Sequence, residues 1–167
     1  EDKLYSLEYD LFCEVREHIA AEVVRIQNTA KAIAMIDVYA SLSVVATQNN
    51  FVRPKINEKG IIDIKNGRHP VVEKMISNDM FIANDTYLDN GMNRISIITG
   101  PNMAGKSTYM RQTALIVLMA QTGSFVPADS ANICIVDRIF TRVGASDDLA
   151  SGQSTFMVEM TEVANIL

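Results

Sequence analysis

The sequence predicts an α/β domain that follows a long helical segment, and three features carry this prediction. Apolar residues recur every three or four positions from Leu4 to Ile33, and the same spacing continues to Val45. This is the period of one face of an α-helix. From Asn93 the pattern changes, because the β-branched run RISIIT at 94–99 leads directly into a glycine-bearing loop and a second helical pattern. Such a succession is typical of an α/β fold with a buried parallel strand.

Length and charge limit what the chain can do. Its 167 residues suffice for one ordinary core, or for one domain with an appendage. The 15 Lys and Arg residues are outnumbered by 20 Asp and Glu residues, which leaves a net charge of −5. No large basic face is therefore expected to hold duplex DNA tightly without other parts of a protein. Cys13 and Cys134 form no C-x-x-C pair, so we expect two reduced, buried thiols and no disulfide framework or zinc site.

We expect a soluble, cytoplasmic chain with no membrane partner. No uninterrupted apolar stretch reaches the roughly 18 residues that a bilayer-spanning helix needs. The first residues are acidic, whereas a signal peptide begins with a basic region followed by an apolar one. The chain starts at Glu1 without a methionine, and Leu167 falls inside a helical pattern. We therefore expect this polypeptide to be a segment of a longer protein.

The N-terminal segment 1–50 is expected to be helical and to link or lever domains. Its first helix should extend over about 30 residues, or about 45 Å at 1.5 Å per residue. Asn28, Thr29 and Asp37 are weak helix formers, so a break or kink into a second helix is an open alternative. An ordinary bundle helix is the alternative to a lever.

Residues 51–167 are expected to form one α/β domain. Short strand and turn material is predicted at 60–65 and 70–76, around His69. This histidine has no second ligand at metal-binding spacing, so we expect it to donate to a backbone carbonyl. The remaining predicted elements are strands at 94–99, 133–136 and 139–143, a helix at 106–121 with Gly123 as its stop, and a helix at 156–167 capped by Ser154 or Thr155.

The loop after the predicted strand matches the phosphate-binding pattern G-x-x-x-x-G-K-[ST]. Glycines permit backbone angles that direct successive N–H groups at a phosphate. Lys106 is expected to bridge the β- and γ-phosphates, and Ser107 to provide an oxygen ligand to Mg²⁺. A glycine-bearing turn without function is the alternative. The complete predicted cradle comprises Gly100, Pro101, Asn102, Met103, Ala104, Gly105, Lys106, Ser107 and Thr108.

The catalytic half of an ATPase site is not evident. Hydrolysis requires an acidic residue at the end of a second strand and a group that orients water. Asp137 follows the apolar run 133–136, but the next residue is Arg138 and not a second acid. Asp147 and Asp148 follow a Gly-Ala-Ser loop and are better suited to the start of a turn or helix. We therefore expect nucleotide binding without hydrolysis by this chain.

A second anion site is possible at SGQST, residues 151–155, which precedes the last helical pattern. The serine hydroxyl and the unpaired N–H groups at the positive end of the helix dipole could bind an anion there. Taken alone, this is only a capped helix. A P-loop covers one side of a triphosphate, however, so Ser154 of a second copy could close the γ-phosphate side.

Four ordered motifs together resemble the MutS family of DNA mismatch-repair ATPases. They are NGRHPVVE at 66–73, FIAND at 81–85, TGPNMAGKSTYMRQ at 99–112 and DRIFTRVGASDDLASGQSTFMVEMTE at 137–162. The helical segment 1–50 resembles, less specifically, the end of that family's lever between DNA clamp and ATPase domain. The resemblance implies a partial P-loop ATPase domain of the ABC-like branch, at 51–167.

The resemblance also implies residue roles. Phe81 and Ile82 match the pair that packs on the adenine of ATP or ADP. Asn102 matches a loop residue near the γ-phosphate, and Ser154 the serine offered in trans. Ala104 stands where many relatives have glycine, which we interpret as a tolerated variant. The family's Asp-Glu pair for Mg²⁺ and water follows after the position of Leu167, so the chain is expected to stop before the Walker B strand.

The longer protein is accordingly expected to couple ATP binding and hydrolysis to the state of a DNA clamp. Its implied partners are a second copy of the ATPase domain, mismatched duplex DNA and downstream repair factors. The sequence STFMVEM at 154–160 is more typical of bacterial than of eukaryotic members of the family. Two alternatives remain open: a small complete P-loop kinase that uses Asp137 for Mg²⁺, and a non-catalytic interaction module with a structural loop.

Overall fold

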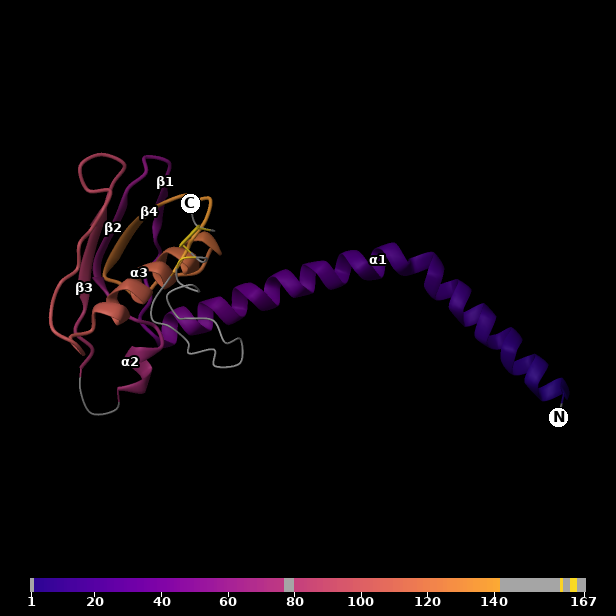
Figure 1. Cartoon of the computed structure of the whole chain (residues 1–167). Coiled ribbons are helices and arrows are strands. Elements are labelled where there is room, and N and C mark those ends of the chain that lie inside the picture. Colours follow the sequence, from indigo (N-terminus) through magenta and orange to yellow (C-terminus); the bar gives the residue numbers. More distant parts are fainter. Residues whose placement is uncertain (1, 77–79, 142–159, 161–162, 165–167) are drawn as a thin grey trace. The chain divides into compact units, whose positions relative to one another are not determined.

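The computed structural model describes residues 2–76, 80–141, 160, 163 and 164. The chain divides into two compact units, 1–44 and 45–167. The first consists of most of one helix, and the second contains the sheet and the shorter helices (Figure 1). The candidate site lies entirely in the second unit.

The N-terminal helix, α1, is continuous over Asp2–Gln48 and has 47 residues. The alternative of a break near Asn28, Thr29 or Asp37 is therefore wrong. Thr29 shows how a weak helix former is accommodated, because its hydroxyl donates to the carbonyl of Arg25 at 2.9 Å, one turn back. The length corresponds to about 70 Å at the usual rise per residue.

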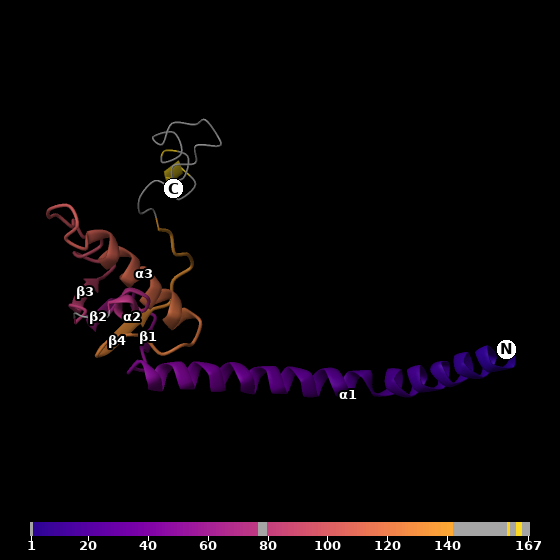
Figure 2. The ribbon, with the colours of Figure 1, turned by 90° about the horizontal axis from the view of Figure 1, so that it is seen from below.

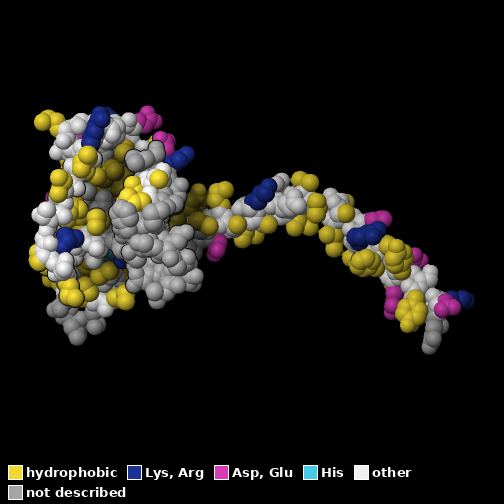
Figure 3. Space-filling view, in the orientation of Figure 1, with side chains coloured by type: hydrophobic (Ala, Val, Ile, Leu, Met, Phe, Trp, Pro, Cys, Tyr) yellow, Lys and Arg dark blue, Asp and Glu magenta, His cyan; other side chains and the backbone are white. Residues whose placement is uncertain are grey.

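Apolar side chains are exposed along α1 (Figure 3). Ala46 is the one buried residue of the helix. An 18-residue window of α1 has a mean hydropathy of 1.4, so the helix is long and apolar enough to cross a membrane by length and composition. The expectation that no segment qualifies considered only uninterrupted apolar runs, whereas a window average admits polar residues between apolar ones. Core helices of soluble proteins meet the same criterion, and the finding is weak support for a membrane span.

The sheet in the second unit is small and mixed. Its strands are β1 (Lys55–Asn57), β2 (Ile62–Gly67), β3 (Asn84–Leu88) and β4 (Ser130–Cys134), in the order β1-β4-β2-β3. β1 pairs with β4 in parallel, while β2 is antiparallel to both β4 and β3. The observed class is therefore mixed α/β, as expected, but the described sheet is not the parallel one that the sequence predicts.

Helix α3 (Lys106–Gln121) packs on the sheet and encloses the core (Figures 1 and 2). Its bounds agree with the predicted helix, and Gly123 ends it as expected. With φ of 82°, Gly123 donates to the carbonyl of Ala120 at 3.1 Å, and the following Ser124 donates to that of Met119 at 3.0 Å. These two bonds form a Schellman motif. The buried apolar core is Ile64, Ile116, Val117, Ala120, Val126, Ala128, Ala131 and Ile133.

The predicted strand at 94–99 does not form. These residues are irregular, and the side chains of Ile95 and Ile97 are 85% and 86% exposed. A β-branched run favours extended backbone, but a strand also requires a neighbour that completes its hydrogen bonds. In the described part of the chain no strand pairs with this segment, and the sheet consists of β1, β4, β2 and β3 alone.

Three smaller predictions also need correction. Part of 70–76 forms a short helix, α2 (Val72–Met75), in place of strand and turn. The strand expected at 133–136 begins earlier and ends at Cys134. Residues 139–141 are irregular, and the rest of that predicted strand lies outside the described residues. Of the helix predicted at 156–167 only Met160, Val163 and Ala164 are described, and all three are helical.

Candidate functional site

The loop at 100–105 has the backbone angles of a phosphate cradle. Gly100, Met103 and Gly105 have φ values of 145°, 65° and 84°. No atom of the described residues lies within 4 Å of a Cβ built on Gly105, so its backbone angle favours glycine there. Met103 adopts a left-handed angle that a residue with a Cβ takes only at some cost, and such strain is found mostly at functional sites.

The backbone angles of the loop also explain why alanine is tolerated at position 104. Its φ is not positive, because the left-handed conformations are taken by Met103 before it and Gly105 after it. A Cβ at position 104 therefore meets no backbone restriction. This agrees with the interpretation of Ala104 as a tolerated variant.

The loop leads directly into the N-terminus of α3. Gly105 is the N-cap and supplies no side-chain hydrogen bond to the first turn. The N–H groups of the first helical turn have no carbonyl partner within the helix, and the helix dipole makes this end positive. These are the features of an anion site at a helix N-terminus. The loop and helix of the predicted strand–loop–helix unit are thus present, while the strand is not.

Lys106 lies across this loop. Its Nζ donates to the carbonyl oxygens of Gly100 and Pro101, both at 2.6 Å. The ammonium group is consequently held against the backbone at the start of the loop. Ser107, the predicted magnesium ligand, is exposed on the first turn of α3.

A hollow of about 580 Å³ brings the predicted base and phosphate residues together. Phe81 and Ile82 line it from one segment, and Gly105 and Lys106 line it from another, with Ala104 and Thr108 beside them. Five predicted cradle residues do not line it, and Ser154 lies outside the described residues. Those five are Gly100, Pro101, Asn102, Met103 and Ser107.

A partly buried cluster of hydroxyl groups connects the two sides of the hollow. Thr86 on β3 donates to Tyr109 Oη on α3 at 2.9 Å, and Tyr109 Oη donates to the carbonyl of Asp85 at 3.2 Å. Thr113, one turn further along α3, lies 3.3 Å from Thr86 between the two hydroxyl oxygens. β3 follows the segment of Phe81 and Ile82, so this cluster links the strand next to these two residues to α3.

The NGRHP motif anchors the same strand. Asn66 has φ of 50° at an irregularity between β2 and β3, and its N–H donates to Asp85 Oδ1 at 2.8 Å. This hydrogen bond, together with Lys65 at 3.4 Å, holds the pKa of the Asp85 carboxyl below its usual value. Asn66 also donates to Asp129 Oδ2 at 2.7 Å. The motif therefore joins β2, β3 and the approach to β4.

Arg68 of this motif contacts the end of α1. Its Nη2 donates to the carbonyls of Asn49 and Asn50 at 3.3 and 3.1 Å, just beyond the last residue of the helix. Arg68 Nε also forms an ion pair with Glu73 at 2.8 Å. A cation at the C-terminal end of a helix is favoured by the helix dipole.

His69 has a structural role, as predicted, but its side chain accepts hydrogen bonds. Nδ1 receives the N–H groups of Val71 and Val72 at 3.3 and 3.2 Å, at the start of α2. The short chain reversal before α2 directs those N–H groups at the ring, a polarity that the residue type alone does not reveal. Burial lowers the pKa of His69 below 6.5, which favours the neutral ring that can accept.

Lowering the pH from 7.5 to 5.5 is expected to reduce the free energy of unfolding through His69. Because the folded pKa lies below 6.5, the unfolded chain binds more protons, and the stabilisation present above 6.5 is lost as the pH falls. Urea unfolding at several pH values measures this slope. His69→Asn retains a side-chain acceptor but does not titrate, so its slope should be shallower than that of the wild type. Parallel slopes would contradict the assignment.

Asp137 does not belong to the hollow. It is exposed, and β4 ends three residues before it, at Cys134. Among the described residues, no Asp or Glu lines the hollow, and none of the described His, Cys, Asp and Glu side chains gather in threes as a metal site. The doubt about a catalytic role for Asp137 is therefore supported by its position.

Sequence reasoning missed the polar side chains that complete the hollow. Asn84, Tyr109 and Gln112 line it in addition to the predicted residues. The signal for two of them was the spacing after Lys106, since positions 109 and 112 follow it at helical intervals on one face of α3.

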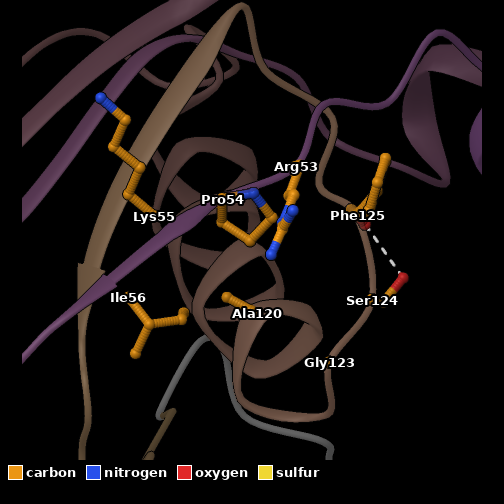
Figure 4. Close-up of a pocket in the computed structure, with 8 residues that line it drawn as sticks. All are labelled: Arg53, Pro54, Lys55, Ile56, Ala120, Gly123, Ser124 and Phe125. Atoms are coloured by element: carbon orange, nitrogen blue, oxygen red, sulfur yellow. Dashed lines mark hydrogen bonds between the residues drawn. The ribbon is translucent and has the colours of Figure 1, made fainter.

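A second hollow of about 760 Å³ lies between β1 and the C-terminal end of α3 (Figure 4). It is lined by Arg53, Pro54, Lys55 and Ile56 on one side and by Ala120, Gly123, Ser124 and Phe125 on the other. Ser124 Oγ donates to the carbonyl of Phe125 at 3.0 Å. This hollow contains none of the predicted site residues.

Comparison with known proteins first defines the class of domain. Residues 96–167 match the family model of MutS domain V. Over all 167 residues the chain is 78% identical to the DNA mismatch repair protein MutS of Lachnoclostridium phytofermentans. It is 65% identical to the MutS of Acetivibrio thermocellus and 64% identical to that of Clostridioides difficile, again over its whole length. The chain is therefore similar to bacterial MutS proteins over the whole segment that it spans. That segment covers 18%, 19% and 18% of these three bacterial relatives.

Proposed function

We propose that this chain is the ATP-binding part of a mismatch repair protein of the MutS type. The loop at 100–108 binds the phosphates of ATP or ADP, and Phe81 and Ile82 pack on the adenine. A P-loop ATPase fold of the ABC-like branch is part of this proposal, and the segment 1–50 acts as the end of a lever.

One observation carries the proposal. The loop residues Gly105, Lys106 and Thr108 line the same hollow as Phe81 and Ile82, which lie more than 20 positions earlier in the sequence. A nucleotide needs a cationic, N–H-rich region for its phosphates and an apolar surface for its base. The two sides of this hollow provide these two chemistries.

The donor set also suits a magnesium nucleotide. Ser107, exposed on the first turn of α3, is the oxygen ligand that the loop would offer to Mg²⁺, with water and phosphate oxygens as further ligands. When bound, the ion neutralises phosphate charge. Lys106 contributes a second positive charge, and the first turn of α3 contributes N–H groups.

At the level of the longer protein, ATP binding and hydrolysis change the state of a DNA clamp. A second copy of the domain completes the site, with Ser154 offered to the γ-phosphate of its partner's nucleotide. Mismatched duplex DNA and repair factors are its further partners, and the protein acts in the cytoplasm. The identity to bacterial MutS proteins supports this extension, whereas the chain alone has no excess of basic residues for DNA.

The two rival functions have less support. A small P-loop kinase would require an acid near the phosphates, and Asp137 does not line the hollow. A non-catalytic module does not account for a left-handed Met103, an uncapped helix N-terminus and a lysine held over the same loop.

Binding of ATP and of inorganic triphosphate by the purified chain tests the proposal. Phe81→Ala is expected to weaken ATP binding by roughly 10-fold, from lost stacking, and to leave triphosphate binding nearly unchanged. Isothermal titration calorimetry in the presence of Mg²⁺ measures both. Phe81→Leu keeps an apolar side chain but has no ring. Its affinity for ATP should lie between those of the wild type and Phe81→Ala. If the wild type binds neither ligand, the proposal is wrong; if Phe81→Ala loses both ligands together, the base role of Phe81 is wrong.

A further inference from the structure

Gln112 is a buried side chain that has no hydrogen-bond partner among the residues that the structure describes. The residue is 1% exposed, and neither Nε2 nor Oε1 of its amide is bonded to any described protein group. Buried amides are nearly always paired, because an unpaired one loses its bonds to water without replacement. An exception of this kind calls for a functional explanation.

The position of Gln112 in the hollow suggests a function for its unpaired amide. It lines the hollow that also contains Lys106 and Phe81, two helical turns beyond the N-terminus of α3. Tyr109 lines the hollow between them on the same face. Since each residue of a helix rises 1.5 Å, the amide lies about 10 Å along the axis from the loop that receives the phosphates. The site therefore has a polar group well removed from its phosphate end.

The backbone beside the amide is shaped to leave it room. A Cβ on Gly67 would meet Gln112 Nε2 at 2.9 Å, Ile64 Cγ2 at 3.0 Å and the carbonyl of Asn84 at 3.2 Å. Glycine at the end of β2 thus lets the amide lie against the strand. By contrast, Gln121 on the same helix has both amide atoms paired, to the carbonyl of Cys134 at 3.0 Å and the N–H of Val136 at 3.4 Å.

We propose that Gln112 is a specificity-determining residue whose amide pairs with the hydrogen-bonding edge of the adenine base. A carboxamide offers one donor and one acceptor side by side, and adenine presents an exocyclic N–H beside a ring nitrogen acceptor. The same pairing of Gln or Asn with adenine is used in DNA recognition. This inference rests on the proposed nucleotide site and deepens it, because it names the protein group that distinguishes bases there.

The test compares ATP with purine riboside 5′-triphosphate, which lacks the 6-amino group, in binding to the full chain. Wild type is expected to prefer ATP by roughly 10-fold, the effect of one unpaired buried amide, and Gln112→Met should abolish this preference. Methionine has similar length and no hydrogen-bonding amide. Inorganic triphosphate should bind equally to both proteins. Gln121→Met serves as the matched control and should leave the preference intact.

Thermal unfolding without nucleotide gives an independent readout. Gln112→Met should keep or raise the melting temperature, because no protein hydrogen bond is lost, whereas Gln121→Met should lower it. An equal loss of stability in both variants would show that Gln112 is bonded in the folded chain and would overturn the inference. An unchanged ATP preference in Gln112→Met would also overturn it, while leaving the nucleotide site intact. Failure of the wild type to bind any triphosphate would instead refute the proposed function, and the inference with it.

Discussion

Replacing Lys106 with alanine is expected to weaken MgATP binding by roughly 10- to 100-fold, because a charge-assisted hydrogen bond contributes about 1.5–3 kcal/mol. Its Nζ lies 2.6 Å from the carbonyls of Gly100 and Pro101, so the charge is already held over the loop. The Lys106 side chain therefore loses little conformational entropy when a phosphate binds. Titration calorimetry of the wild type and the variant gives the ratio directly.

Two comparisons separate this effect from others. Lys59→Ala removes the same charge from an exposed position outside the hollow and should leave affinity unchanged. Lys106→Arg keeps the charge but replaces a compact ammonium by a planar guanidinium, and is expected to restore binding only in part. Because Lys106 also bonds its own loop, the melting temperature of each variant should be measured as well. Equal affinity in Lys106→Ala and the wild type would remove the phosphate-site assignment.

Steady-state hydrolysis of ATP by this chain is expected to be negligible, slower than a complete site by roughly 10³-fold or more, the effect of one missing transition-state group. Binding uses the loop and Lys106. Orienting the attacking water requires an acid near Mg²⁺, and no described Asp or Glu lines the hollow. The proposed contribution of Ser154 from a second copy would also be needed.

Phosphate release from the purified chain, measured at saturating MgATP, tests this prediction. Asp137→Asn is the informative variant, since Asp137 is the strand-ending acid that a small complete enzyme would use. Its residual rate should equal that of the wild type, because Asp137 is exposed and lies outside the hollow. Robust turnover that disappears in Asp137→Asn would favour the kinase-like alternative over the MutS-type site.

The two long helices were predictable from the sequence, whereas the short helix α2 was not. The helix at Lys106–Gln121 and its stop at Gly123 are confirmed, and the apolar period from Leu4 onward corresponds to one helix, Asp2–Gln48. Helical hydrogen bonds join residues four apart, so a pattern read over a few turns contains most of the information that the helix needs. The glycine positions of the loop were predictable for a similar reason, because backbone angles are a local property.

Strands and their pairing were not predictable in this way. The run at 94–99 has strand composition but no partner among the described residues, whereas Lys55–Asn57, for which no strand was expected, pairs with β4. Whether a segment joins a ladder depends on a neighbour far away in the sequence, and local preference decides it only weakly. The mixed order β1-β4-β2-β3 is a consequence of those distant pairings.

For the candidate site, the residue sequence alone was enough to predict a phosphate loop at 100–108, since the G-x-x-x-x-G-K-S pattern is contiguous and its glycine, lysine and serine positions each have a chemical reason. The family resemblance had already indicated Phe81 and Ile82, and the tertiary structure places them in the same hollow as Gly105 and Lys106. Only the structure gave His69 its role as an acceptor and left the amide of Gln112 buried without a partner among the described residues. These three features depend on which side chains from separate segments meet in space. Long-range packing determines such meetings, and the spacing of residues along the chain does not specify it.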